Sequence, residues 1–241
     1  MGIVNQQSGT RIDEIEADVY RISTPVTLIP GGFTFNQYLI DDDMPMLFHS
    51  GLRRMFPLVV AAVNTVLPVE RLRYVGFSHF EADECGALNE FLAVAPQAVP
   101  LCGSIAKMVS VDDVADRQAH GLGDGEELSL GRHRVRWLDT PHLPHAWECG
   151  FLYESSTRTL LCGDLFTQPG ATHEPLTEKD ILEPSEGMRQ MMDYYAHAAN
   201  TGALLEKLAV LEPRTLACMH GAAWRGNGAQ LIRALAERLR A

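Results

Sequence analysis

Histidine and carboxylate side chains suited to metal binding are grouped in four short segments of the sequence. Each segment directly follows a run of residues that predicts a buried strand. The segments are His79-Phe-Glu-Ala-Asp-Glu84, Thr140-Pro-His-Leu-Pro-His145, Cys162-Gly-Asp164 and Met219-His220-Gly221. Because the strand ends of one sheet system tend to gather along one edge, ligands that are distant in sequence can converge there. The sequence therefore predicts one metal site assembled from four strand ends.

The elements that must position these residues alternate between strands and helices in two rounds. Strands are predicted over residues 18–23, 35–40, 45–49, 73–77, 98–102, 127–130, 134–138, 150–154, 159–162 and 215–219. Helices are predicted over residues 57–63, 83–94, 111–118, 186–200, 202–211 and 231–239. This alternation suits sheets covered by helices on their outer faces. The order of elements alone does not separate this layout from other α/β layouts.

The bulk properties of the chain exclude several classes of protein. A length of 241 residues suits a single domain over residues 1–241. The formal net charge of −11 repels phosphate backbones, so we do not expect a nucleic acid partner. We expect a cytoplasmic protein, because no apolar run is long enough for a membrane span and no signal segment is evident.

The cysteines also limit the possible chemistry. There are five of them, an odd number, and no two form a Cys-x-x-Cys pair. This spacing argues against a disulfide framework, a zinc ribbon or a rubredoxin-type iron site.

The metal-ligand pattern resembles the metallo-β-lactamase superfamily, whose usual first motif is His-x-His-x-Asp-His, followed by separate His, Asp and His ligands. The chain departs from this motif at Glu81 and Glu84. The first departure is the one found in flavodiiron proteins, which have His-x-Glu-x-Asp. The similarity to that branch continues through Asn36-Gln-Tyr-Leu-Ile40, Gly86-Ala-Leu-Asn-Glu90, Tyr194-Tyr195 and His220-Gly221. Since no flavodoxin-like segment follows, the chain resembles the stand-alone oxygen-binding di-iron relatives.

The resemblance implies a four-layer αββα sandwich with two metal ions. By position, metal 1 would be held by His79, Glu81 and His145, and metal 2 by Asp83 and His220 with Glu84 as a further ligand, while Asp164 would bridge the two ions. His142 is the alternative to His145. Counting back from the strand at residues 151–153 favours His145.

Charge supports two metal ions. Four carboxylates at one site would repel one another strongly without compensation, and two divalent cations cancel their charge. These are Glu81, Asp83, Glu84 and Asp164. Mixed imidazole and carboxylate ligation suits iron or manganese well and zinc somewhat less. Iron is the metal we expect, with zinc and manganese as alternatives.

Two functions are compatible with such a site. The resemblance favours an oxidoreductase or oxygen-binding protein, in which the metal pair binds or reduces dioxygen or nitric oxide. The sequence has no flavin module, so turnover would need an external electron donor, and the resemblance implies a homodimer. The alternative is a hydrolase acting on an ester, thioester, lactone or phosphodiester, because two ions lower the pKa of a bridging water. Glu81 and Glu84 argue against the hydrolase, since each makes its metal ion a weaker Lewis acid.

Overall fold

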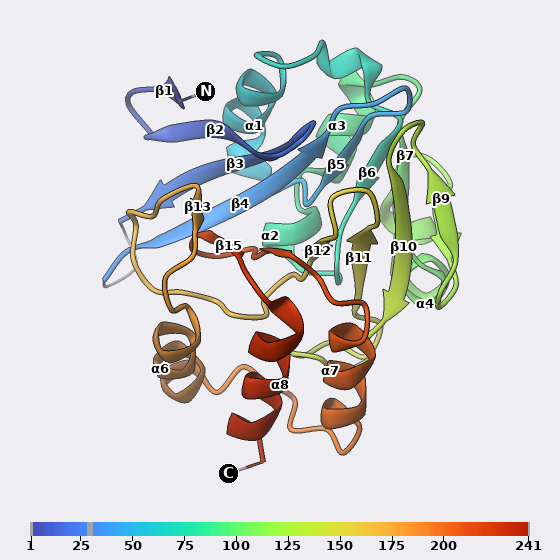
Figure 1. The fold of residues 1–241 in the computed structure, drawn as a ribbon. Helices are drawn as coiled ribbons and strands as arrows, with labels where there is room; N and C mark the ends of the chain where they lie inside the picture. The colour runs from blue at the N-terminus through green and yellow to red at the C-terminus, as the bar shows by residue number, and fades with distance from the viewer. Residues whose placement is uncertain (1, 28–30, 241) are drawn as a thin grey trace.

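The chain folds into two β-sheets that face each other, with helices on both outer faces (Figure 1). The architecture comes from a computed structural model that describes residues 2–27 and 31–240. Helices α1 and α3 cover one sheet, and α6, α7 and α8 cover the other on the opposite side of the molecule. The predicted αββα arrangement of the metallo-β-lactamase fold is therefore confirmed.

The first sheet contains eight strands in sequence order. They are β1 (Gly2–Asn5), β2 (Thr10–Glu16), β3 (Val19–Val26), β4 (Phe33–Ile40), β5 (Met46–Phe48), β6 (Tyr74–Gly76), β7 (Val99–Gly103) and β8 (His120–Leu122). Neighbouring strands are antiparallel from β1 to β5 and parallel from β5 to β8. Every residue of β4 is buried, since this strand is covered on both faces.

The second sheet contains seven strands in the order β13-β15-β14-β12-β11-β10-β9. Their bounds are β9 (Glu127–Ser129), β10 (Arg134–Asp139), β11 (Gly150–Glu154), β12 (Thr159–Leu161), β13 (Leu176–Thr177), β14 (Thr215–Ala217) and β15 (Ala223–Arg225). Strands β12 and β14 are parallel neighbours, with Leu161 opposite Ala217. The chain segments that leave these two strands therefore start side by side.

The helices fill the outer layers. They are α1 (Phe56–Val63), α2 (Ala82–Cys85), α3 (Leu88–Val94), α4 (Ser104–Ala106), α5 (Asp112–Val114), α6 (Leu182–Met192), α7 (Thr201–Ala209) and α8 (Gly228–Arg238). Short 3-10 turns lie at Arg53–Met55 and Val69–Arg71, and a π-helical turn at Lys107–Val111 joins α4 to α5. None of the helices within residues 2–27 and 31–240 is long and apolar enough to span a membrane.

Three apolar cores hold the four layers together. The central core lies between the sheets and includes Tyr38, Phe48 and Trp137, all fully buried. The other two cores lie between each sheet and its helices, with Phe91 of α3 in one and Ile232 of α8 in the other. Burial of large apolar side chains in all three cores is the main force that stabilises the sandwich.

Three predicted helices have different bounds in the structure. The helix expected over residues 83–94 is divided into α2 and α3, because the backbone of Ala87 leaves the helical conformation with ψ of 15°. The helix expected over residues 111–118 instead runs from Ser104 to Val114 through the π-helical turn. The following segment is extended because Arg117 donates hydrogen bonds to carbonyls at the end of α3. The helix expected over residues 186–200 is α6, which ends at Met192 because Asp193 adopts a left-handed conformation with φ of 48°.

Candidate metal centre

All seven predicted ligands come together at one edge of the two sheets. The first-sheet half contributes the segment after β6, which leads into α2, and this segment carries His79, Glu81, Asp83 and Glu84. The second-sheet half contributes three connections: the β10–β11 loop with His145, the turn after β12 with Asp164, and the turn after β14 with His220. The cluster therefore lies where both sheets meet.

Three side chains converge on one point of the cluster. The Nε2 atoms of His79 and His145 are 3.0 Å apart, and Nε2 of His145 lies 3.3 Å from Oε1 of Glu81. The Oε1 atom of Glu81 is 3.7 Å from Nε2 of His79. Two imidazole nitrogens and a carboxylate oxygen that face one point form a donor set suited to one first-row metal ion.

Asp164 lies between this group and a second one. Its Oδ2 atom is 3.4 Å from Nε2 of His145 and 3.7 Å from Nε2 of His79. Its Oδ1 atom is 3.2 Å from Nε2 of His220, which also lies 3.5 Å from Oδ2 of Asp83. The two carboxylate oxygens of Asp164 thus face two different groups of donors.

Glu84 lies on the buried side of the cluster. Its side chain is completely buried, and neither carboxylate oxygen has a hydrogen-bond partner among the described residues. One oxygen lies 3.9 Å from Nε2 of His79. Ligand atoms of Glu84 also group within 4.8 Å with those of Glu81 and Asp83. A buried carboxylate without hydrogen bonds is costly, so this position favours either a protonated carboxyl group or a neighbouring cation.

The far side of each imidazole ring is held by an acceptor. Nδ1 of His145 donates to the carbonyl of Tyr194 at 3.0 Å, and Nδ1 of His220 donates to the carbonyl of Thr34 at 2.8 Å. Nδ1 of His79 is 3.1 Å from Oγ of Ser78. These contacts direct each Nε2 atom at the cluster, where it can bind a metal ion once it is deprotonated, and this is how proteins orient histidine ligands of metals.

Comparison with known proteins places the chain in a family. A family model described as ODP family beta lactamase matches residues 33–221, a range that contains the whole cluster. The chain belongs to this family. The ODP-family chain is 27% identical to the rubredoxin-oxygen oxidoreductase of Megalodesulfovibrio gigas over 211 residues, 83% of this chain and 51% of that protein. It is 26% identical to the nitric oxide reductase of Moorella thermoacetica over 218 residues, 85% of this chain and 53% of that protein.

Solved structures share the fold of the ODP-family chain. Rubredoxin:oxygen oxidoreductase from Desulfovibrio gigas matches with a TM-score of 0.78 and 22% identity, over 94% of this chain and 61% of that chain. A fragment of the diflavin flavoprotein A 5 from a Nostoc species matches with a TM-score of 0.82 and 19% identity, over 96% and 95%. The ODP-family chain spans about half the length of the curated relatives it matches.

The carboxylates of the ODP-family cluster strongly favour positive charge beside them. Hydrogen bonds with His145 and His79 lower the pKa of Glu81 to about 2. Burial opposes charge on His220, yet hydrogen bonds with Asp164 and Asp83 raise its pKa to about 9. Protons on the histidines therefore balance the carboxylates here. Metal ions would take the place of those protons, because ligating imidazoles must be deprotonated.

Two buried carboxylates of the cluster respond differently to burial. Burial raises the pKa of Glu84 well above its usual value, because its nearest histidine, His79, only partly compensates. Burial acts in the same direction on Asp164, but His220 and the other two histidines hold its pKa well below the usual range. The carboxylate oxygens of Glu84, which have no hydrogen-bond partner among the described residues, fit a site that holds cations.

The structure separates the two alternatives in the β10–β11 loop. His145 lies in the cluster, whereas His142 is exposed and its backbone N–H donates to the carbonyl of Ala146 at 2.8 Å. His49 is fully buried, and its Nε2 atom is 3.0 Å from Oγ of Ser78. Ser78 thus joins His49 to the ring of His79, a link that residue types alone did not indicate.

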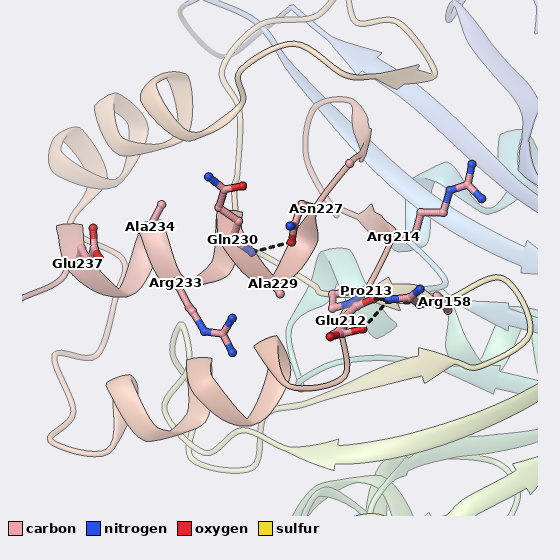
Figure 2. A pocket seen from close by; sticks show the side chains of 11 residues that line it. Arg158, Glu212, Pro213, Arg214, Asn227, Ala229, Gln230, Arg233, Ala234 and Glu237 are labelled. Atoms are coloured by element: carbon pink, nitrogen blue, oxygen red, sulfur yellow. Dashed lines mark hydrogen bonds and ion pairs between the residues drawn. The ribbon is translucent and has the colours of Figure 1, made fainter.

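A hollow of about 720 Å³ beside the start of α8 is separate from the cluster (Figure 2). Three arginines line it, which raises the question of an anion site. Arg158 pairs with Glu212 at 3.2 Å, and Arg233 pairs with Glu206 at 2.7 Å. Two of the three arginines are thus already paired with carboxylates, so the hollow is a weaker candidate site than the cluster.

Proposed function

We propose that this chain holds two iron ions in the cluster and binds or reduces dioxygen or nitric oxide there. The observation that carries the proposal is the position of Asp164, whose two oxygens face two separate groups of donors. The printed names of the relatives, an oxygen oxidoreductase and a nitric oxide reductase, support the choice of substrate. Because the chain covers about half of each relative, both activities are proposals for this chain.

The ligands we propose follow the two groups of donors. Metal 1 is assigned to His79, Glu81 and His145, metal 2 to Asp83, Glu84 and His220, and Asp164 to both. When bound, two ferrous ions would supply electrons to the gas molecule. The four carboxylates of the protein favour this redox role over hydrolysis, because their negative charge stabilises the oxidised metal and weakens its Lewis acidity.

The chain itself determines from which side a small molecule can approach. His79 and Glu84 are completely buried, whereas the side chain of Glu81 is 51% exposed and that of His145 is 21% exposed. The solvent side of the cluster is therefore the side of Glu81 and His145. Trp147, which is 56% exposed, follows His145 closely in the same loop and presents an apolar surface there. Dioxygen and nitric oxide are small and apolar, and both fit such an approach.

Turnover requires electrons from elsewhere. We propose a separate redox protein as the external electron donor, and a homodimer as implied by the resemblance. A nucleic acid partner is not part of the proposal, because the net charge of −11 repels phosphate backbones.

A donor-free reaction tests the proposed function. Protein loaded anaerobically with ferrous iron is mixed with a measured amount of dioxygen or nitric oxide, and gas consumption is followed with an electrode. We expect consumption in proportion to the chains that carry two irons, and its loss in Asp164→Ala. If the two-iron protein consumed neither gas while the zinc-loaded protein hydrolysed esters, thioesters, lactones or phosphodiesters, the hydrolase would replace this proposal.

A further inference from the structure

We propose that strand β4, together with Arg21 of β3, positions His220 and thereby determines how tightly the second metal ion is held. We call the side chains of Arg21, Thr34, Asn36 and Tyr38 the inter-sheet clamp. The clamp belongs to the first sheet, but it forms hydrogen bonds with the loop at residues 218–221, which follows β14 of the second sheet. The inference rests on the proposed function, because it treats His220 as a metal ligand.

The clamp follows from the alternation of side chains along a strand. Thr34, Asn36 and Tyr38 are two residues apart on β4, so they share one face. Arg21 lies directly opposite Tyr38 in the register between β3 and β4 and shares that face. Tyr38 also belongs to the central core, so this face is directed at the second sheet. The polar row thus lies on the face that is directed at the second sheet.

The side chains of the clamp hold the two ends of the loop. Tyr38 donates its hydroxyl hydrogen to the carbonyl of Cys218 at 2.7 Å. Asn36 donates from Nδ2 to the same carbonyl at 2.9 Å and to the carbonyl of Gly221 at 2.8 Å. Arg21 donates from Nη2 to the carbonyl of Gly221 at 2.5 Å. Four hydrogen bonds therefore fix the residues on either side of Met219 and His220.

Further hydrogen bonds, most of them to backbone atoms, fix His220 itself. The N–H of Asn36 donates to the carbonyl of Met219 at 2.9 Å, and the N–H of Gly221 donates to Oγ1 of Thr34 at 2.8 Å. Nδ1 of His220 donates to the carbonyl of Thr34 at 2.8 Å, which orients the ring. Phe33 stacks on that ring with a centroid distance of 4.3 Å. Nε2 is thereby left to face Asp164 and Asp83.

This arrangement distinguishes the two metal groups. Both groups join ligands from the two halves, but in the first group the ring of His145 is held by Tyr194, which lies in the same half as His145. In the second group, which joins Asp83 of the first-sheet half to His220 of the second, the ring of His220 is held across the sheets by Thr34 of β4. Its geometry therefore depends on the alignment of the two sheets, and the clamp is what fixes that alignment at His220. Loss of the clamp should affect metal 2 far more than metal 1.

Two variants of β4 test the inference. Asn36→Ala removes two donors, and Tyr38→Phe removes one hydroxyl while it keeps the buried ring. Bound iron is measured by anaerobic equilibrium dialysis against graded ferrous iron, together with the thermal midpoint of the metal-free protein. We expect Asn36→Ala to weaken one of two binding steps about 10–100-fold, the range typical of lost outer-shell contacts, and to leave the other step within about twofold. Tyr38→Phe should weaken the same step by less.

The matched control is Tyr20→Phe, which removes the hydroxyl of a buried tyrosine in the adjacent strand, on the face that packs in the core with the helices. It should leave both binding steps unchanged. If Asn36→Ala folded and kept both steps at wild-type strength, or weakened both equally, the inference would be overturned. Failure of the proposed function is recognised separately, because the wild-type chain would then not bind two ferrous ions at all.

Discussion

At the scale of a single residue, Glu84 leads to the most specific prediction. The usual superfamily pattern has histidine at this position, and here a completely buried carboxylate stands without a hydrogen-bond partner among the described residues. With Glu84 included, the cluster has four carboxylates, whose charge would balance that of two divalent cations. Under the proposed function, Glu84 would therefore allow the site to hold two ions without net charge.

The substitution Glu84→Gln tests this role, since it removes the charge and keeps the size. We expect the weaker of two ferrous binding steps to lose more than about 100-fold in affinity, beyond the 10–100-fold range typical of outer-shell changes. Bound iron per chain at limiting ferrous iron measures the effect. Glu90→Gln, a partly exposed glutamate of α3, is the control and should bind iron as the wild type does. Unchanged binding in Glu84→Gln would remove Glu84 from the proposed ligands.

Residue types carried most of the information about the cluster. The seven predicted ligands could be found because histidine and carboxylate after a strand form a recognisable pattern. The groups that hydrogen-bond to the three histidine rings could not be predicted. Two of these three groups are the backbone carbonyls of Thr34 and Tyr194, and a backbone carbonyl leaves no signal in the residue type. Ser78 lay beside a predicted ligand, but its link to His49 depends on the approach of β5 to β6 in space.

At the scale of elements, an ion pair joins the two ends of the β10–β11 hairpin. Nδ1 of His133 lies 3.1 Å from Oε1 of Glu154, and both side chains are buried. The contact with Glu154 raises the pKa of His133. Burial opposes charge on Glu154, but hydrogen bonds with His133 and Thr157 lower its pKa to about 2. Asp18 and Asp42 also face His133 and add to the same effect.

This pair predicts a pH-dependent stability. Because the folded pKa of His133 is raised, its contribution is complete below the unfolded pKa of about 6.5 and disappears as the pH rises through the folded pKa. We expect His133→Gln to lower the free energy of unfolding by about 1 kcal/mol near pH 5.5 and by clearly less near pH 9. Urea unfolding at the two pH values measures this difference.

An exposed pair serves as the control for that measurement. His197 and Asp193 approach to 2.7 Å, but both side chains are more than half exposed. His197→Gln should change stability by less than about 0.5 kcal/mol at either pH, as is usual for pairs screened by solvent. An equal loss in both variants, or a loss in His133→Gln that grew with pH, would contradict the assigned role of His133.

Element positions were predictable where the pattern was strong. The strands at residues 150–154 and 35–40 are present as expected, because each is a continuous buried run. The helix expected over residues 111–118 was wrong in its bounds, because Arg117 binds carbonyls of another helix. The strands β1, β2, β8, β13 and β15 were not predicted. Strands β8, β13 and β15 have two or three residues each, and pairing with neighbours in space defines them rather than their own sequence.

At the scale of the whole molecule, the cluster links the two halves of the sandwich. Four of the proposed ligands belong to the first-sheet half and three to the second. Ions bound there stabilise only the folded chain, because the ligands are far apart in an unfolded one. Binding at about 100 times the dissociation constant contributes about 2.7 kcal/mol per site, which corresponds to roughly 5–10 °C in the thermal midpoint of a domain of this size.

Removal of metal should therefore lower the thermal midpoint by at least that amount. Circular dichroism melting curves with and without a ferrous chelator measure the shift. Asp164→Ala should melt at the same temperature under both conditions, since it lacks the residue shared by both groups. A wild-type chain whose midpoint did not respond to the chelator would contradict the proposed link between the sheets.

The central claim is that this fold holds two iron ions that react with oxygen. The most direct test is the metal content of protein purified without air, together with its optical spectrum before and after exposure to air. Two irons per chain, with a near-ultraviolet to visible absorption band that appears on exposure, is the result we predict. Two zinc ions per chain and a spectrum that air does not change would contradict the claim and favour the hydrolase.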